Sequence, residues 1–238
     1  MNSNRIKKRA TSSQLLKNRI ELNKKHQNSD FKTWQYKVYK KITSRYLKNK
    51  NSLKIKILDV GSGDGLQVSH FLKIFKNVEI WCLDYSHNSL KSLRAKYKSK
   101  NIKIFKLDMN NLHKFIANRK LTNYFHIAHS SYALYYAKNQ LRVLNTMNVS
   151  LLKGGFFIVS APSEPHEMVN LIAKNYTIPS KILNTLKFFK DILLPYLKQK
   201  GKKLLIDKKI NYLNFKKTND FINFWKNILI TAYSTVLI

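Results

Sequence analysis

The feature that most constrains this chain is a regular alternation of strand and helix patterns between residues 53 and 160. Short apolar runs typical of buried strands are separated by segments whose apolar residues recur at helical spacing. Strands are expected at 53–60, 78–84, 101–108, 124–130 and 156–160. Because strands that alternate with helices pair in parallel through right-handed crossovers, the pattern predicts a doubly wound α/β sheet with helices on both faces.

The helices between these strands are indicated by apolar stripes and by capping residues. The stripe after the first strand consists of Val68, Phe71, Leu72 and Phe75. The stripe before the fifth strand consists of Leu141, Leu144, Met147 and Leu151. Ser86 is suited to cap the helix after the second strand, and a short helix is expected at 110–118. The pair Gly154-Gly155 is expected to end the last of these helices.

Acidic side chains stand where three successive strands are predicted to end. Asp59, Asp84 and Asp108 occupy these positions, and Asp64 lies in the loop after the first strand. The chain has 45 Lys and Arg against 12 Asp and Glu, a net charge of +33, so this gathering runs against the composition. Ligands of doubly wound sheets bind beyond the carboxyl ends of the strands, so the pattern predicts a binding crevice there. The fourth strand adds His129-Ser130 to the same edge.

A glycine-rich loop, Gly61-Ser62-Gly63-Asp64-Gly65, follows the first strand and uses three of the six glycines in the chain. Glycine allows a sharp bend and a close approach of the backbone to a ligand. The spacing lacks the third glycine of a dinucleotide fingerprint, since Leu66 stands there, and Asp64 would repel a pyrophosphate. An acidic crevice suits a cofactor with positive charge, ribose hydroxyls and no phosphate, and S-adenosylmethionine has these properties.

Four segments together resemble the class I S-adenosylmethionine-dependent methyltransferases. They are LDVGSGDG (58–65), CLDYS (82–86), KLDMN (106–110) and LLKGGFFIVS (151–160). The resemblance covers about residues 53–160 and implies a Rossmann-like sheet of seven strands, one of them antiparallel. It also implies that Asp84 accepts both ribose hydroxyls, that Tyr85 lies beside the adenine and that Asp108 lies at the adenine edge. The full expected set of cofactor residues is Asp59, Gly61, Ser62, Gly63, Asp84, Tyr85, Asp108, Met109 and Ser130.

The segment HIAHSSYALYYAKN (126–139) resembles the corresponding part of histamine N-methyltransferase and related small-molecule methyltransferases. The resemblance suggests that Tyr132, Tyr135 and Tyr136 line an acceptor pocket, and core packing is the alternative for these rings. His129 at the end of the fourth strand is the candidate general base, and a hydrogen-bonded structural imidazole is the alternative.

The rest of the chain is expected to add to this unit. Residues 1–50 are expected to form a basic N-terminal helical cap over the cofactor, and residues 51–238 the methyltransferase domain. After Pro162 the expected elements are helices at 165–200, a strand pair near 203–215, a helix at 218–228 and a final strand.

The partners are only partly constrained. The charge is spread along the chain and rich in Lys, which fits a compositional bias as well as a surface for RNA. Cys82 is the only cysteine, which excludes a disulfide framework and a thiolate zinc site and leaves no expected metal. Neither Cys82 nor any Asp/Asn-Pro-Pro-Tyr/Phe motif supports DNA methylation, and no membrane segment is evident.

We therefore expect a cytoplasmic enzyme that methylates a small molecule. An RNA methyltransferase and a noncatalytic S-adenosylmethionine-binding protein remain the alternatives.

Overall fold

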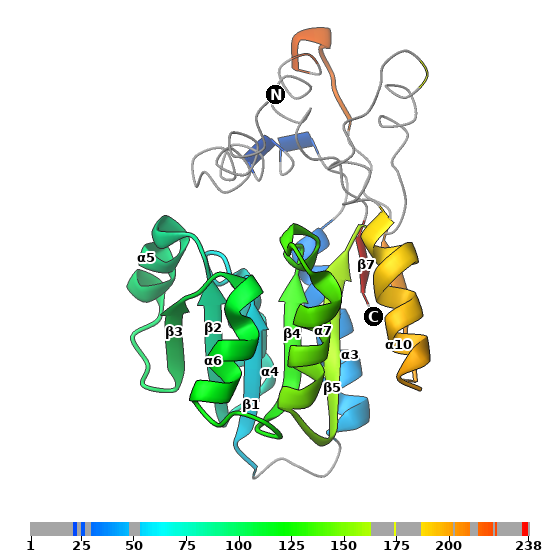
Figure 1. Ribbon diagram of the computed structural model, residues 1–238. Helices are drawn as coiled ribbons and strands as arrows, with labels where there is room; N and C mark the ends of the chain where they lie inside the picture. The colour runs from blue at the N-terminus through cyan, green and yellow to red at the C-terminus, as the bar shows by residue number, and fades with distance from the viewer. Residues whose placement is uncertain are drawn as a thin grey trace.

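A computed structural model describes residues 21–22, 25–26, 30–47, 53–162, 174, 187–201, 203–209, 214–220, 222 and 235–237 of the chain. Its centre is a parallel sheet made of β1 (Ile55–Val60), β2 (Val78–Asp84), β3 (Ile102–Lys106), β4 (Phe125–Ser131) and β5 (Leu151–Ala161). Two short strands, β6 (Asp207–Lys209) and β7 (Thr235–Leu237), extend the edge beside β5, with β7 antiparallel to both neighbours. The strand order is β3-β2-β1-β4-β5-β7-β6 (Figure 1). The parallel core confirms the predicted α/β class.

Helices cover both faces of the sheet. One layer holds α3 (Phe31–Tyr46), α4 (Leu66–Ile74) and α5 (His87–Lys96). The other layer, in front in Figure 1, holds α6 (Leu112–Asn118), α7 (Gln140–Ser150) and α10 (Leu194–Gln199). Shorter turns are η1 (Met109–Asn111), η2 (Leu134–Tyr136) and η3 (Phe188–Leu193). Among the described residues, no helix has the length and apolarity needed to cross a membrane.

Strand alternation decides which β1 side chains meet which helical layer. Ile55 and Ile57 belong to the core under α3, α4 and α5, whereas Leu58 and Val60 belong to the core under α6 and α7. Asp59 has the parity of Ile55 and Ile57, so its side chain enters the α3 and α4 side of the sheet. The predicted cap of α5 is confirmed, because Ser86 Oγ accepts a hydrogen bond from Ser89 N at 3.3 Å.

The prediction that Gly154-Gly155 ends a helix is wrong. The helix α7 ends at Ser150, and both glycines lie within β5 where its register against β4 shifts. A Cβ on Gly155 would lie 3.1 Å from the carbonyl oxygens of Phe125 and His126, so glycine permits close approach of the two strands. The predicted α7 stripe also needs correction, because Leu141 is 50% exposed and the helix buries Val143 beside Leu144 and Met147.

The helix α3 forms part of one helical layer of the fold. It lies on the same face of the sheet as α4, and Val38, Tyr39 and Ile42 are buried in that core (Figure 1). Residues 1–20 of the expected N-terminal cap lie outside the described residues, as do most of the expected helical segment at 165–186 and of the expected helix at 218–228.

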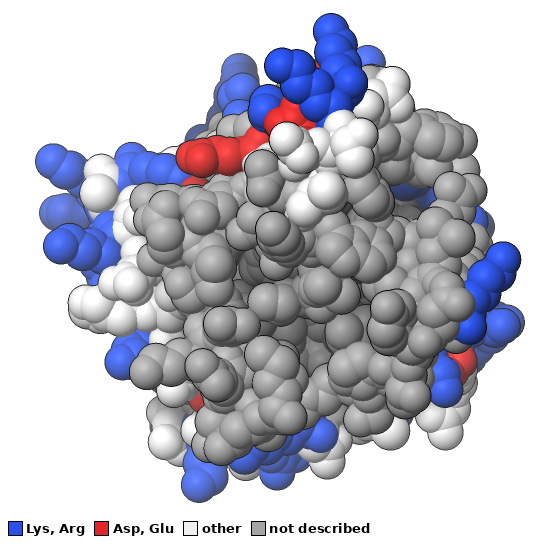
Figure 2. Space-filling model, turned by 90° about the horizontal axis from the view of Figure 1, so that it is seen from above, with Lys and Arg blue, Asp and Glu red and all other residues white. Residues whose placement is uncertain are grey.

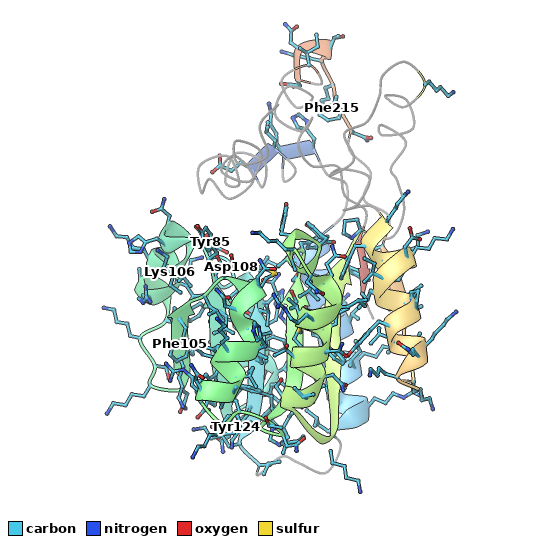
Figure 3. All side chains as sticks on the ribbon, viewed as in Figure 1. Tyr85, Phe105, Lys106, Asp108, Tyr124 and Phe215 are labelled. Atoms are coloured by element: carbon cyan, nitrogen blue, oxygen red, sulfur yellow. The ribbon has the colours of Figure 1, made fainter. Side chains whose placement is uncertain are left out.

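A polar network lies at the amino ends of the strands, opposite the predicted crevice. The carboxylate of Glu79 accepts hydrogen bonds from Trp81 Nε1 at 2.7 Å and Tyr124 OH at 3.0 Å, and it pairs with Lys54 and Lys103. Burial raises the pKa of Glu79, but these hydrogen bonds and lysines outweigh burial and lower the pKa to about 2. Tyr124 marks this lower end of the sheet in Figure 3.

Candidate functional site

The glycine loop joins β1 to α4 at the carboxyl edge of the sheet, and hydrogen bonds to the neighbouring strand ends hold it in place. Gly61 N and Ser62 N both donate to the carbonyl oxygen of Leu83, at 2.7 and 3.1 Å. Ser62 Oγ donates to the carbonyl of Asp59 at 2.9 Å, and Ser130 Oγ donates to the carbonyl of Val60 at 2.7 Å. Because both hydroxyls are buried and bonded to backbone, Ser62 and Ser130 hold the loop in place.

The three loop glycines all have left-handed backbone angles, yet they serve different purposes. A Cβ on Gly61 would lie 2.2 Å from the Cβ of Ala133, and one on Gly65 would lie 2.8 Å from the ring of Tyr97. These two positions are glycine because neighbouring protein atoms occupy the space. A Cβ on Gly63, with φ +56°, would meet no atom of the described residues within 4 Å. Gly63 therefore borders open space at the crevice.

Asp84 ends β2 and braces the same loop. Its Oδ2 accepts from Gly63 N at 2.8 Å and its Oδ1 accepts from Ser86 N at 2.7 Å. Burial raises the pKa of Asp84, and the backbone hydrogen bonds from Ser86 and Gly63 oppose this effect. A carboxylate has about four acceptor sites, so Asp84 keeps capacity for a hydroxyl donor of a ligand.

Tyr85 and Asp108 lie together at the corner formed by the ends of β2 and β3 (Figure 3). Tyr85 is 54% exposed. Asp108 Oδ1 accepts from the backbone and side-chain nitrogens of Asn110 at 3.0 and 2.7 Å and caps η1, which begins at Met109. The sequence-predicted neighbours Asp84, Tyr85 and Asp108 are thus brought to one edge.

Asp64, the fourth acid expected in the crevice, pairs elsewhere. Its carboxylate accepts from Lys96 Nζ on α5 at 2.8 Å, and its side chain is 53% exposed. The local loop sequence could not show this, because Lys96 lies on the next helix. Asp64 therefore contributes to the rim of the loop.

His129 lies in a closed hydrogen-bonded chain. Its Nδ1 is 2.6 Å from Asp59 Oδ1 and its Nε2 is 2.7 Å from the hydroxyl of Tyr39 on α3. All three side chains are buried, with exposed fractions of 0–1%. Both ring nitrogens are thus engaged away from solvent, and this geometry gives no support to His129 as a general base that touches a substrate.

The three tyrosines after β4 have different surroundings. Tyr132 closes β4 with φ +54°, a strained angle for a bulky residue, and its N–H donates to Ser160 O at 2.9 Å. Tyr135 is 7% exposed and belongs to the hydrophobic core, with its ring 6.3 Å from that of Phe188. Tyr136 is 40% exposed, so of the two η2 tyrosines it is the one that faces outward.

Sequence reasoning missed Tyr39 and two glutamines as polar residues of this edge. Gln35 on α3 and Gln67 on α4 both donate to Ser131 Oγ, at 3.5 and 3.2 Å. The buried positions 35, 38, 39 and 42 follow helical spacing, which is a signal for a packed helix face. Nothing local to α3 indicates a partner on β4, about 90 residues away.

Similarity to known proteins agrees with this geometry. The sequence profile of a family described as "Methyltransferase domain" matches residues 51–212, more than half of the chain. The chain belongs to this methyltransferase family. No curated protein matches the sequence of this methyltransferase.

Solved structures with a similar fold are also methyltransferases. The plantazolicin methyltransferase BpumL aligns with a TM-score of 0.58 and 11% identity over 98% of this chain and 92% of its own. The DszA carbon methyltransferase aligns with a TM-score of 0.56 and 14% identity over 87% of this chain. The citrinin polyketide synthase CMeT domain aligns with a TM-score of 0.55 and 13% identity over 85% of this chain. This methyltransferase spans about half the length of the last two chains.

The residues at the carboxyl edge fit S-adenosylmethionine in three respects. Gly63 leaves space beside the loop that none of the described residues fills. The exposed Tyr85 follows Asp84 in the sequence and lies near Asp108 in Figure 3, and the two carboxylates can accept from hydroxyl and amino groups. The second carboxylate oxygen of Asp59, Oδ2, is buried with no hydrogen-bond partner among the described residues, and an ammonium group would supply one.

Proposed function

We propose that this methyltransferase transfers the methyl group of S-adenosylmethionine to a nitrogen or oxygen of a small molecule. The observation that carries the proposal is the contact between the glycine loop and the segment after β4. A Cβ on Gly61 would overlap that of Ala133. Tyr132 precedes Ala133, and Tyr136 N donates to the Ala133 carbonyl at 3.0 Å, so we place both tyrosines beside the methionine side of the donor site. The acceptor therefore enters beside these two tyrosines.

The chemistry asks the protein mainly for alignment. S-adenosylmethionine supplies a methyl group on a positively charged sulfonium, and displacement requires the nucleophile in line with the carbon–sulfur bond. Holding both reactants in that geometry supplies most of the rate. A partly exposed ring such as that of Tyr136 can orient a planar or cationic acceptor by its face. An acceptor that reacts as a neutral amine or a carboxylate needs no protein base before attack.

The same proposal assigns the residues of the carboxyl edge to the parts of S-adenosylmethionine. Asp84 accepts the ribose hydroxyls, Tyr85 covers one adenine face, and Asp108 with the Met109 backbone contacts the adenine edge. The loop at Gly61–Gly63 lies along the methionine portion, and Asp59 receives its ammonium group. Ser130 supports the loop from β4.

The proposal also covers the domain organisation. We assign residues 51–238 to one domain with a seven-stranded sheet in which β7 is the antiparallel strand. Residues 1–50 are assigned to an N-terminal extension that contributes α3 to the helical layer and caps the acceptor side. The short β6–β7 pair at the sheet edge supports the first assignment, and the buried side of α3 supports the second.

The two neighbouring tyrosines of η2 make a matched test of the acceptor site. We expect Tyr136→Ala to lower turnover about tenfold with little change in donor affinity, because it removes positioning of the acceptor only. Tyr135→Ala is expected to cost about 3 kcal/mol of unfolding free energy, because it empties a buried ring position. Steady-state kinetics and chemical unfolding of both variants check this. Full turnover by Tyr136→Ala on the identified substrate would remove it from the acceptor site.

The substrate itself is found by transfer of a labelled methyl group into fractions of a cell extract. The proposal expects label in the small-molecule fraction, with the reaction lost in Asp84→Ala. Label that accumulates in RNA and disappears after ribonuclease treatment would overturn the small-molecule assignment.

RNA is the second candidate acceptor, and one surface favours it. Residues 91–106 hold seven basic side chains and no acid, and they run along α5 and the edge strand β3 beside Tyr85. Lysines on an edge strand also prevent sheet-to-sheet aggregation, so this surface has a simpler explanation. Lys and Arg stand around the rim in the view from above (Figure 2). If RNA is the acceptor, its affinity should fall steeply with salt and with charge removal at Lys98 and Lys100.

A further inference from the structure

Three buried side chains connect helix α3 to the strand that carries the glycine loop. Tyr39 on α3 contacts His129 on β4 at 2.7 Å, and His129 contacts Asp59 on β1 at 2.6 Å. Asp59 and His129 are direct neighbours in the parallel pairing of β1 with β4. These hydrogen bonds thus link helix α3 to strands β4 and β1, which are far apart in the sequence.

The ring of Phe71 packs against two of these three hydrogen-bonded side chains. The ring of Tyr39 stacks on Phe71 of α4 at 5.4 Å, and the ring of His129 meets Phe71 edge-on at 5.1 Å. Burial raises the pKa of Tyr39, so its hydroxyl keeps its proton at neutral pH. An Asp carboxylate oxygen accepts, so His129 Nδ1 donates to Asp59 Oδ1 and leaves Nε2 to Tyr39. The orientation of the Asp59 carboxylate is therefore set by α3 through the imidazole.

One oxygen of the anchored carboxylate and one amide oxygen on α3 lack hydrogen-bond partners among the described residues. Asp59 Oδ2 and Gln35 Oε1 are buried acceptors that have no hydrogen-bond partner among the residues the structure describes. A buried acceptor without a donor is costly, which points to a ligand group with several N–H donors. The Asp59 carbonyl also holds Ser62 of the glycine loop, so Asp59 lies where the loop begins.

We propose that Tyr39 is a positioning residue of the methyl-donor site, which acts through His129 to fix Asp59 for the ammonium group of the donor. This rests on the proposed placement of the methionine portion of the donor against Asp59. The hydroxyl of Tyr39 touches neither reactant. It holds the imidazole, and the imidazole holds one oxygen of Asp59 so that the other oxygen is presented to the donor.

The test compares two ligands that differ in the amino-acid portion. S-adenosylhomocysteine carries the ammonium group, whereas 5′-methylthioadenosine has the same adenosine and sulfur without it. In Tyr39→Phe, which keeps the ring stacked on Phe71, we expect S-adenosylhomocysteine affinity to fall about tenfold and methylthioadenosine affinity to stay within about twofold. The matched control is Thr43→Val, which removes a buried hydroxyl whose hydrogen bonds among the described residues stay within α3, and it should change neither affinity.

Calorimetry on the full chain distinguishes the outcomes. If wild type binds S-adenosylhomocysteine and Tyr39→Phe binds it equally well, the positioning role is overturned while the donor site stands. An equal loss of both ligands overturns it too, because it shows a general structural effect. If Tyr39→Phe does not fold, the affinities of His129→Gln for the same two ligands test the proposal. The shorter glutamine amide would keep a contact toward Tyr39 and lose the hydrogen bond to Asp59. Failure of wild type to bind S-adenosylhomocysteine overturns the donor-site assignment itself.

Discussion

Asp84→Ala is expected to weaken the binding of S-adenosylhomocysteine by about 1.5 to 3 kcal/mol. Two ribose hydroxyls would lose a charged acceptor that is already placed for them by backbone donors. The same change removes the hydrogen bond that Gly63 N donates to Asp84 Oδ2, so the loop also loses a stabilising contact. Titration calorimetry of the variant and the wild type measures the difference directly.

The control for this variant is Asp64→Ala. Asp64 is the nearest other acid of the loop, but its carboxylate is 53% exposed and pairs with Lys96. Removing it changes the net charge by the same amount as Asp84→Ala, so we expect donor affinity within about twofold of wild type because exposed ion pairs contribute little. Equal losses in the two variants would mean that charge in general, and not the ribose contact, explains the effect.

Gly63→Val is expected to abolish donor binding and to leave the protein folded. The new side chain would point into space where none of the described residues has an atom within 4 Å of the new Cβ, and a ligand against the loop requires this space. The left-handed angle of φ +56° is unfavourable for valine and costs about 1 to 2 kcal/mol. Circular dichroism and calorimetry on the same sample separate the loss of fold from the loss of binding.

Gly154→Val is the matched control. Gly154 also has a left-handed angle, φ +78°, and open space around a new Cβ, but it lies near the start of β5 at the opposite end of the sheet. It should carry the same backbone strain and bind the donor normally. Unfolding of Gly63→Val alone would show instead that Gly63 is needed by the fold.

The parts of the site that were predictable depend on local patterns and on topology. The apolar strands and the cap at Ser86 are signals within a few residues. Once the strands are parallel, Asp84, Tyr85 and Asp108 must share an edge, because they follow the ends of neighbouring strands.

The remaining features depend on contacts between distant segments. Gly61, Gly63 and Gly65 look equivalent in the sequence, and only the positions of Ala133 and Tyr97 separate the packed glycines from the open one. The pair at 154–155 suits a helix end and a register shift equally well, so the sequence could not choose between them. His129 lies near the carboxyl end of β4, and its burial depends on the distant helix α3.

The central claim is that the carboxyl edge of this sheet binds a methyl donor. Calorimetric titration of the wild-type chain with S-adenosylhomocysteine tests it most directly. We expect saturable binding of one ligand per chain at micromolar affinity. No heat of binding at millimolar ligand, from a protein that circular dichroism shows to be folded, would contradict the claim.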